Sequence, residues 1–358
     1  MSYPPASNKS NGEIDRAGQL LLSEPKTSND YKLALITVNE WRASFSYPMN
    51  TFTTTLRDKT RKYKNVIIAQ RLKRLPTILN KLDRFHGMQL SRMQDIGGVR
   101  AVLNTIDEVS ELEEQYLSKG RLSHILKRHD DYINTPKNDG YRGIHLVYEY
   151  NNTLARNGMA PQYNGLLIEM QIRTKLQHSW ATAVEAMGTF IGDSFKNGAG
   201  SAEWREFFAL TSSAFAHAEG CPYCPQHKHL YPAQIYKKIK DIDSKIDALD
   251  HIKALSAAAN LIHKNLSTSG KKHAYYSLIS LDLDNKRVEV QSFNKDNLDK
   301  ATYMYEQLEQ RHGRFDQVLV AVSSLISLKE AYPNYFLDIR NFTELVSIII
   351  AEISIDGV

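Results

Sequence analysis

Alternating apolar and polar residues in the segment 166–174, LLIEMQIRT, restrict the fold of this chain more than any other feature. Successive side chains of a β-strand point to opposite faces, so the segment predicts a strand with one buried and one polar face. The polar face would carry Glu169, Gln171 and Arg173. A carboxylate in this position is a candidate catalytic group.

A turn precedes this strand. The chain is extended from Tyr132, turns through PKNDG at 136–140 and re-enters a strand at Ile144, as its Pro, Asn, Asp and Gly residues favour. The turn displays Lys137 and Tyr141, and His145 follows on the strand. An exposed tyrosine can stack on a base, although a core tyrosine is the alternative and a histidine taken alone is more often structural.

Strands alternate with helices through the first half of the chain. We expect strands at 66–70, 95–103 and 166–174, and helices at 51–68, 76–90, 107–119 and 175–190. This order predicts an α/β (α+β) domain with a sheet flanked by helices.

The second half has a different pattern. We expect a helix at 203–217, a long helix with one apolar seam at 232–266 and a polar linker at 267–272. Residues 275–358 read as a small α+β domain with strands at 287–293, 317–322 and near Phe336, and a helix at 298–311.

Composition limits the environment. With 42% hydrophobic and 24% charged residues among 358, the chain has the composition of a soluble globular protein, and its net charge of +5 is compatible with a nucleic-acid partner. No apolar run reaches the roughly 18 residues that span a bilayer, so we expect a cytoplasmic protein without a membrane partner. Residues 1–26 are polar and are expected to be flexible.

Two further motifs complete a recognisable set. RLKRLPTILNKL runs from Arg71 to Leu82, and DIGGVR runs from Asp95 to Arg100. With the turn and the strand that follow, they resemble the synthetase domain of the RelA/SpoT family over about the first 200 residues. The resemblance implies a nucleotidyltransferase-like fold with a mixed sheet, and a pyrophosphokinase that uses ATP and Mg²⁺ to pyrophosphorylate a ribose 3′-hydroxyl.

The resemblance implies a role for each motif residue. Asp95 would bind Mg²⁺, and Glu169 would act near the attacking hydroxyl as a base or second metal contact; alone, Asp95 is as readily a helix cap or surface acid. The planes of Arg71 and Arg100 would hold adenine, with Lys73, Arg74 and Lys81 on the phosphate side. The expected acceptor-binding residues are Lys137, Tyr141, His145, Gln171 and Arg173. Any one of the cations, taken singly, reads as an exposed solubilising charge.

Departures from the family pattern lie on the acceptor side. Asp139 and Gly143 replace asparagine and serine of the PKxNGYxSxH loop, and Ala186 stands where many alarmone synthetases have histidine. These changes put a GDP or GTP acceptor in question and resemble the toxic branch of small synthetases, some of which modify the 3′ CCA end of tRNA and so inhibit translation. A tRNA acceptor is therefore the first hypothesis. A (p)ppGpp synthetase is the second, and an inactive RNA- or protein-binding module, disfavoured by the retained acids, is the third.

A basic surface would suit a tRNA acceptor stem, with a solvated helix face as the alternative. The candidate RNA-binding residues are Arg57, Lys59, Arg61, Lys62, Lys64, Lys127 and Arg128.

The C-terminal region lacks a catalytic cluster. The arrangement resembles the fused toxin-antitoxin enzymes of the CapRel type, in which a pseudo-zinc-finger domain blocks the active site until a phage protein binds. In those enzymes a YxxY pair covers the ATP pocket, and Tyr332 and Tyr335 have this spacing, with core tyrosines as the alternative. The expected division is a flexible 1–26, a synthetase (toxin) domain 27–218, a Cys/His loop and linker helix 219–271, and an antitoxin domain 272–358.

A CxxCxxHxH motif lies in the predicted linker. Cys221, Cys224, His227 and His229 are zinc-ligand types, but the two halves are closer together than in the usual finger. The favoured interpretation is a proline-broken loop with incidental thiols.

Overall fold

The computed structural model describes residues 3–118, 123–152, 160–190, 201–268, 275–282, 287–309, 315–321 and 335–355. The chain divides into two compact units, each treated separately below. Unit 1 comprises Met1–Ile133 and Gly143–Lys175, and unit 2 comprises Asn134–Arg142 and Leu176–Val358. The loop with Lys137 and Tyr141 therefore belongs to unit 2. The expected division into four segments stays a prediction, because the two compact units have other boundaries.

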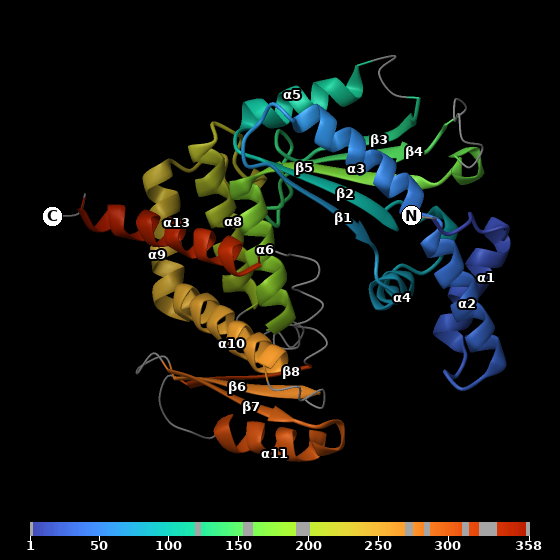
Figure 1. The fold of residues 1–358 in the computed structure, drawn as a ribbon. Helices are drawn as coiled ribbons and strands as arrows, with labels where there is room; N and C mark the ends of the chain where they lie inside the picture. Colours follow the sequence, from blue (N-terminus) through green and yellow to red (C-terminus); the bar gives the residue numbers. More distant parts are fainter. Residues whose placement is uncertain are drawn as a thin grey trace. The chain divides into compact units, whose positions relative to one another are not determined.

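Unit 1 is built on a five-stranded mixed sheet (Figure 1). In spatial order its strands are β1 (Ile67–Leu72), β2 (Gly97–Leu103), β5 (Leu167–Thr174), β4 (Ile144–Glu149) and β3 (Ile125–Asp131). β2 and β5 are parallel, and the other neighbours are antiparallel. The predicted α+β fold with a mixed sheet is confirmed.

The sheet has one apolar and one polar face. Ile168, Met170 and Ile172 are fully buried, whereas Glu169 and Gln171 between them are only partly covered. α3 (Ser46–Thr60) and α5 (Ile106–Leu117) pack on the strands at the centre of the sheet (Figure 1). The helix layer covers the apolar residues and leaves the alternating polar residues on the other face.

Gly97 brings β2 close to this helix layer. A Cβ at Gly97 would lie 2.8 Å from Cδ1 of Phe45 and 3.0 Å from Cδ1 of Ile168. A Cβ at Gly98 would meet only backbone oxygens, at 3.6 Å and 3.7 Å. The two glycines of DIGGVR therefore differ: Gly97 allows close packing, and Gly98 keeps the polar face open.

The N-terminal segment is helical, which corrects the expectation of a flexible 1–26. α1 (Asn11–Ser23) begins with a capping box between Ser10 and Glu13, and buries Ile14 and Leu21. α1 packs beside α2 (Asn29–Ala43) and contacts α4 (Leu75–Arg84). The local composition is polar, but apolar residues at helical spacing and a good cap are sufficient for an amphipathic helix.

Two predicted helices end earlier than expected. α3 stops at Thr60 instead of continuing to 68, and Asn65 adopts a φ of 54° before β1 begins. α4 stops at Arg84 instead of 90, and Gly87 has a φ of 86°. A residue with positive φ does not fit a right-handed helix, so neither helix could reach its predicted end.

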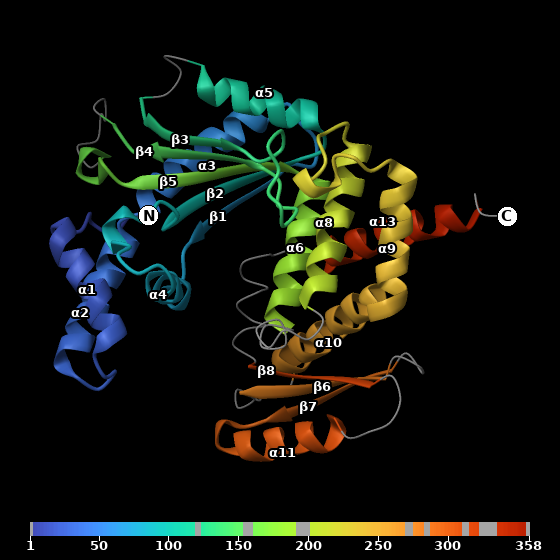
Figure 2. The ribbon, with the colours of Figure 1, turned by 180° about the vertical axis from the view of Figure 1, so that it is seen from behind.

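Unit 2 combines helices with a three-stranded sheet (Figure 2). Its helices are α6 (Lys175–Phe190), α8 (Ser201–Ala218), α9 (Pro232–Ile246), α10 (Ala248–Thr268), α11 (Leu298–Glu309) and α13 (Tyr335–Ile355). The antiparallel strands β7 (Arg287–Phe293), β6 (Tyr276–Asp282) and β8 (Phe315–Ala321) lie in that order. The sheet lies between α10 and α11 (Figure 2).

The C-terminal residues share a core with the central helices of unit 2. Phe342 of α13 lies 5.9 Å from Phe208 and 5.8 Å from Phe215 between ring centroids. Ile279 of β6 and Val346 of α13 belong to the same buried cluster. The expected strand near Phe336 was wrong, because α13 begins at Tyr335 and buries residues at helical spacing.

The predicted long helix is two helices. The seam expected at 232–266 is interrupted at Asp247, which has a left-handed φ of 48°. Asp243 accepts a hydrogen bond from the N–H of Leu249 at 2.9 Å, across this break. In the described part of the chain, no helix combines the length and the apolar character that crossing a membrane requires.

The glycines of β2 allow a matched test of packing. Gly97→Ala should lower the free energy of unfolding by about 1–3 kcal/mol, because the new methyl group meets Phe45 and Ile168. Gly98→Ala should change it by less than about 1 kcal/mol. Urea unfolding measures both; an equal loss in the two variants would contradict this account of the strand.

Candidate active site

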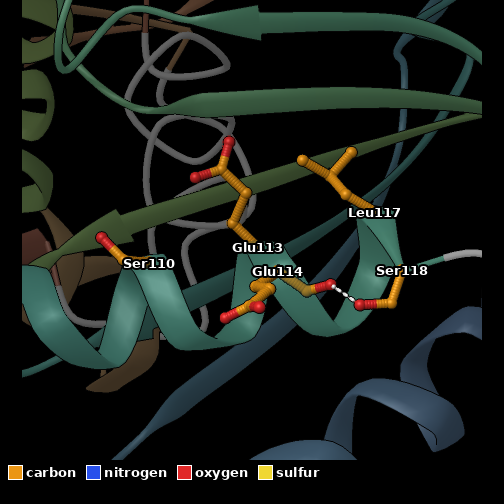
Figure 3. A pocket seen from close by; sticks show the side chains of 5 residues that line it. All are labelled: Ser110, Glu113, Glu114, Leu117 and Ser118. Atoms are coloured by element: carbon orange, nitrogen blue, oxygen red, sulfur yellow. Dashed lines mark hydrogen bonds between the residues drawn. The ribbon is translucent and has the colours of Figure 1, made fainter.

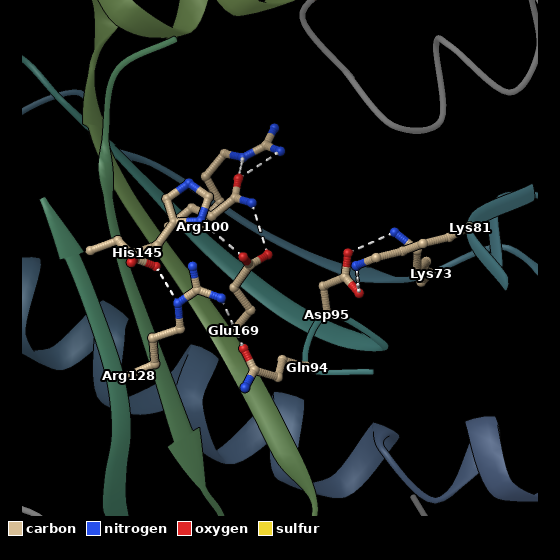
Figure 4. Close-up of polar contacts among 10 residues, drawn as sticks. Lys73, Lys81, Gln94, Asp95, Arg100, Arg128, His145 and Glu169 are labelled. Carbon is tan, nitrogen blue, oxygen red and sulfur yellow. Dashed lines mark hydrogen bonds and ion pairs between the residues drawn. The ribbon is translucent and has the colours of Figure 1, made fainter. Parts of the chain in front are cut away.

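Asp95 is held between two lysines on the polar side of unit 1 (Figure 4). Its carboxylate accepts hydrogen bonds from Nζ of Lys73 at 2.7 Å and from Nζ of Lys81 at 3.1 Å. Burial alone would raise the pKa of Asp95, but the hydrogen bonds and charges of the lysines outweigh burial and hold the pKa below its ordinary value. Asp95, in the turn two residues before β2, is therefore ionised near neutral pH.

Arg42 positions Lys73, and sequence reasoning missed it. Nε and Nη2 of Arg42 donate to the carbonyl oxygen of Lys73 at 3.1 Å and 2.8 Å. The N–H of Lys73 donates to the carbonyl oxygen of Ile96 at 2.7 Å. Arg42 lies on α2, outside the motifs, and the sequence carries no signal that pairs it with a carbonyl 31 residues away.

A polar network spans three strands around Glu169 (Figure 4). Nδ1 of His145 lies 2.9 Å from Oε1 of the Glu169 carboxylate, and Nε2 of Gln171 donates to Oε2 at 2.9 Å. Arg100 in turn donates to Oε1 of Gln171 at 3.3 Å and 3.2 Å. Burial would raise the pKa of Glu169, but the bond from His145 and its charge reverse this effect, so the pKa lies below its usual value.

Strand register places the predicted ATP-side arginines on the same face as Glu169. Gly98 lies opposite both Arg71 on β1 and Glu169 on β5, and Arg100 lies opposite Gln171. Directly opposed residues share a face, and diagonal neighbours are roughly 7–8 Å apart, within reach of long side chains. The adenine-binding role of Arg71 and Arg100 stays a prediction.

Two other predicted cations lie at the ends of elements. Arg74 immediately precedes α4 as its N-cap residue. Arg173, near the end of β5, is 2% exposed, and within the described residues its Nε and Nη2 have no hydrogen-bond partner. A buried guanidinium with unused donors favours an anion, which agrees with the predicted acceptor-side role and does not test it.

The predicted acceptor loop is ordered inside unit 2. Nζ of Lys137 lies 5.1 Å from the ring centroid of Tyr141. Oδ1 of Asp139 accepts a hydrogen bond from the N–H of Tyr141 at 2.9 Å. An asparagine could accept the same bond, so Asp139 preserves the turn while adding a charge.

The candidate RNA-binding residues are largely paired with acids of unit 1. Arg61 pairs with Asp58 at 2.7 Å, Lys127 with Glu149 at 3.0 Å and Arg128 with Asp130 at 2.7 Å, and Lys62 pairs with Glu111. Nζ of Lys59 lies 5.0 Å from the ring centroid of Tyr116. Local pairing reduces the positive potential that these side chains offer to a phosphate backbone. Their RNA-binding role, with that of Arg57 on α3 and Lys64 after it, stays a prediction.

The structure describes all four members of the CxxCxxHxH motif, for which a zinc site was the less favoured interpretation. Among the described residues, which include all four members of the motif, no group of three or more ligand-type side chains could hold a metal ion. Cys224 is fully buried, and its Sγ lies 4.0 Å from Nη2 of Arg142. His227 contacts Ser213 at 2.9 Å and Glu206 at 3.2 Å, and His229 is exposed. Nδ1 and Nε2 of His227 are thus engaged within the protein.

The YxxY pair falls mostly outside the described residues. Tyr332 lies among the undescribed residues, and Tyr335 is the first residue of α13. The autoinhibitory role of these tyrosines stays a prediction.

A hollow of about 330 Å³ lies along one side of α5 (Figure 3). It is lined by Ser110, Glu113, Glu114, Leu117 and Ser118. None of these is a predicted site residue, and burial raises the pKa of Glu113 despite its bond to His129. A hollow lined by two acids does not suit a phosphate ligand.

Comparison with known proteins supports the sequence interpretation of this region. Residues 70–190 match the family model described as the region found in RelA / SpoT proteins. This match covers both lysines at Asp95, the Glu169 network and the turn between β3 and β4. The predicted RelA/SpoT resemblance is confirmed for this segment; the toxic branch and the CapRel type stay predictions.

Two curated relatives are named as GTP pyrophosphokinases. GTP pyrophosphokinase YjbM of Bacillus subtilis (strain 168) is 30% identical over 119 residues, which are 32% of this chain and 52% of the relative. GTP pyrophosphokinase YwaC of the same organism is 29% identical over 126 residues, 31% of this chain and 52% of the relative. The chain spans about half the length of these curated relatives.

Solved structures give a weaker likeness. Small alarmone synthetase 1 from Bacillus subtilis, bound to its product pppGpp, aligns with a TM-score of 0.41 and 21% identity. The alignment covers 54% of this chain and 94% of that one.

The lowered carboxyl pKa values predict a pH dependence. Groups with a lowered folded-state pKa contribute stability above the unfolded pKa, and this contribution is lost as the pH falls through the folded value. Asp95 and Glu169 should therefore make the free energy of unfolding fall below about pH 4. In Asp95→Asn this slope should be shallower, as urea unfolding at stepped pH can measure; identical slopes would contradict the ionised pairing.

Proposed function

We propose that this chain is a RelA/SpoT-type pyrophosphokinase that moves pyrophosphate from ATP to a ribose 3′-hydroxyl. The observation that carries the proposal is the placement of two ionised carboxylates, one in the turn just before β2 and one on the parallel neighbour β5, each among cationic or hydrogen-bonding side chains. Asp95 lies with Lys73 and Lys81, and Glu169 lies with His145 and Gln171. Both acids fall within the segment that matches the family model.

Mg²⁺ fits this donor set. It prefers a few carboxylate oxygens together with retained waters, and the lowered pKa values of Asp95 and Glu169 keep both groups in the ligand form. When bound, Mg²⁺ would offset the charge of the triphosphate. Asp95 would hold the ion, and Glu169 would be the second metal contact or act on the hydroxyl.

The reaction forms a bond between the acceptor O3′ and the β-phosphorus of ATP. The bond from this phosphorus to the oxygen bridging to the α-phosphorus breaks, and AMP leaves with that oxygen. Lys73, Lys81 and Arg74 would stabilise the charge on the phosphates, and Arg71 and Arg100 would hold the adenine.

Glu169 is suited to orient the attacking hydroxyl. A lowered pKa makes the carboxylate a weak base, but phosphoryl transfer depends mainly on positioning and charge stabilisation. The carboxylate would accept the hydroxyl proton as the O3′–phosphorus bond forms. His145 and Gln171 would fix the direction of its two oxygens.

We propose the 3′ end of tRNA as the acceptor, with inhibition of translation as the outcome. The proposal is supported by Gly143, which adopts a φ of 147° where the family has serine, and by Ala186 in place of histidine. Asp139 supports it less, because asparagine would serve the same turn. A guanine nucleotide is the second candidate, favoured by the names of the GTP pyrophosphokinase relatives. Either substrate pair would place the enzyme in the cytoplasm.

The transfer assay distinguishes these acceptors. Incubation with ATP labelled in the γ-phosphate should label deacylated tRNA, with release of AMP, and label found solely on GDP or GTP would replace tRNA by the second candidate. Glu169→Gln should lower the rate at least about a hundredfold, because the oriented carboxylate is lost.

Glu149→Gln is the matched control for the catalytic variant. Glu149 lies on neighbouring β4 and pairs with Lys127. The control should retain transfer while losing an acid from the same sheet. Full activity of Glu169→Gln with any acceptor would remove Glu169 from the mechanism.

We also propose that residues from 272 onward restrain the enzyme as a fused antitoxin, with a phage protein as the trigger. The support is the CapRel-like arrangement and the YxxY spacing of Tyr332 and Tyr335. Cutting the chain near residue 271 is a poor test, because it removes Ile339, Phe342 and Val346 from the core of unit 2. Substitutions in the full chain avoid this problem.

The tyrosine pair can be tested in the full chain. Combined Tyr332→Ala and Tyr335→Ala should raise the transfer rate at least about tenfold, because the tethered cover is lost. Tyr303→Ala on α11, where the side chain is 61% exposed, is the control and should leave the rate unchanged. Unchanged rates in both variants would reject inhibition through the YxxY pair.

A further inference from the structure

The loop Asn134–Arg142 is packed tightly into unit 2 at Gly140. A Cβ at Gly140 would lie 2.7 Å from Cζ2 of Trp180, 3.0 Å from Cβ of Ser212 and 3.2 Å from Cα of Ala209. Gly140 also has a left-handed φ of 95°. The backbone of the loop therefore lies directly against α6 and α8, where a larger residue would not fit.

Ser212 of α8 ties together the two residues that flank Tyr141. Its hydroxyl donates to the carbonyl oxygen of Gly140 at 2.6 Å and accepts from Nε of Arg142 at 3.0 Å. Ser212 and Arg142 are buried, with 2% and 3% of their surfaces exposed. A buried hydroxyl that both donates and accepts is a strong local restraint, because breaking either bond leaves a polar group unpaired.

Arg142 strengthens this restraint. Burial lowers the pKa of its guanidinium, against the effect of the nearby thiols of Cys224 and Cys221. Nη2 of Arg142 also lies 4.0 Å from Sγ of Cys224. A buried charge needs specific hydrogen-bond partners, so the side chain has few positions in which it can stay buried.

Other hydrogen bonds of the loop connect Gly140 with the predicted acceptor residues Lys137 and Tyr141. The N–H of Gly140 donates to the carbonyl oxygen of Lys137 at 3.1 Å, and the N–H of Lys137 faces the carbonyl oxygen of Tyr141 at 3.4 Å. Nε2 of Gln226, in the segment after α8, donates to the carbonyl oxygen of Asn138 at 2.8 Å.

We infer that Ser212 is a positioning residue for the acceptor, since it holds the loop that presents Lys137 and Tyr141. This inference rests on the proposed function, in which Tyr141 stacks on the acceptor base. Ser212 itself contacts the loop and acts through it. The predicted ATP-side residues belong to unit 1, so the effect of Ser212 should be confined to the acceptor.

The test separates the two substrates in the full-length protein. Ser212→Ala should raise the KM for the acceptor that the wild type uses by about tenfold, because two hydrogen bonds that hold the loop are lost. The KM for ATP and the kcat at saturating acceptor should stay within about twofold of the wild type. Equal changes in both KM values, or a fall in kcat alone, would overturn the positioning role.

Ser213→Ala is the matched control. Ser213 is the next residue of α8, is equally buried, and contacts His227 at 2.9 Å and the N–H of Cys224 at 3.2 Å. Ser213→Ala should lower the free energy of unfolding by about as much as Ser212→Ala does, without a change in the acceptor KM. An acceptor KM raised equally in both variants would show that general loosening of α8, and not the loop contact, is responsible.

Hydrogen exchange provides a readout that does not depend on activity. Amide exchange at Gly140 and Tyr141 should accelerate in Ser212→Ala and stay unchanged in Ser213→Ala. Unchanged exchange at Gly140 would refute the restraint itself. Absence of transfer by the wild type, with accelerated exchange in Ser212→Ala, would instead reject the proposed function and with it the acceptor role, while leaving the restraint established.

A second variant protects the test against misfolding. Gln226→Ala removes an exposed side chain that donates to Asn138, so it should fold normally. Its acceptor KM should rise in the same direction by roughly threefold, since one exposed hydrogen bond is lost. No change in Gln226→Ala together with a misfolded Ser212→Ala would count against the inference.

Discussion

Parallel pairing of β2 with β5 is the constraint on which the candidate active site depends. The pairing aligns Gly98 with Glu169 and Arg100 with Gln171, so the DIGGVR and EMQIRT motifs present their polar residues on one face. Parallel neighbours cannot be joined by a tight turn, and here the long crossover contains α5 and the hairpin of β3 and β4. Gly97 packs closely against Phe45, and this allows β2 to lie near the helix layer.

The electrostatics of the site follow from this register. Partial burial ordinarily raises the pKa of a carboxylate. Asp95 and Glu169 nevertheless have lowered pKa values, because cations and hydrogen-bond donors surround each one. The two acids are supported differently. Asp95 is neutralised by lysines that can turn toward a phosphate, whereas Glu169 is oriented by the side chains of neighbouring strands. This difference suits the first group to a charged ligand and the second to holding one hydroxyl in a fixed direction.

Local patterns were sufficient to predict most of the sheet but not its supports. Alternation at 166–174 predicted β5 and the face that carries Glu169, because strand periodicity is a property of the segment itself. Arg42 was not predicted as a site residue, because its contact with the carbonyl oxygen of Lys73 arises from tertiary packing and belongs to no sequence motif. The break at Asp247 was missed because the apolar seam continues on both sides and the left-handed residue is not glycine. α13 was read in part as a strand near Phe336, where aromatic residues carry strand propensity that helix packing overrides.

The loop at 134–142 shows why departures from a family motif need a structural context before they bear on specificity. Asp139 differs from asparagine in the motif, but its side chain makes a turn contact that either residue can make, so the added charge is the informative part of the change. Gly143 differs from serine and has a φ of 147°, at which a residue with a side chain would be strained. Between these two positions, Arg142 is buried against Ser212, so both residues that flank Tyr141 are hydrogen-bonded to α8. Under the proposed function, acceptor binding would therefore depend on the anchoring of this loop to α8 as well as on the identity of residue 139.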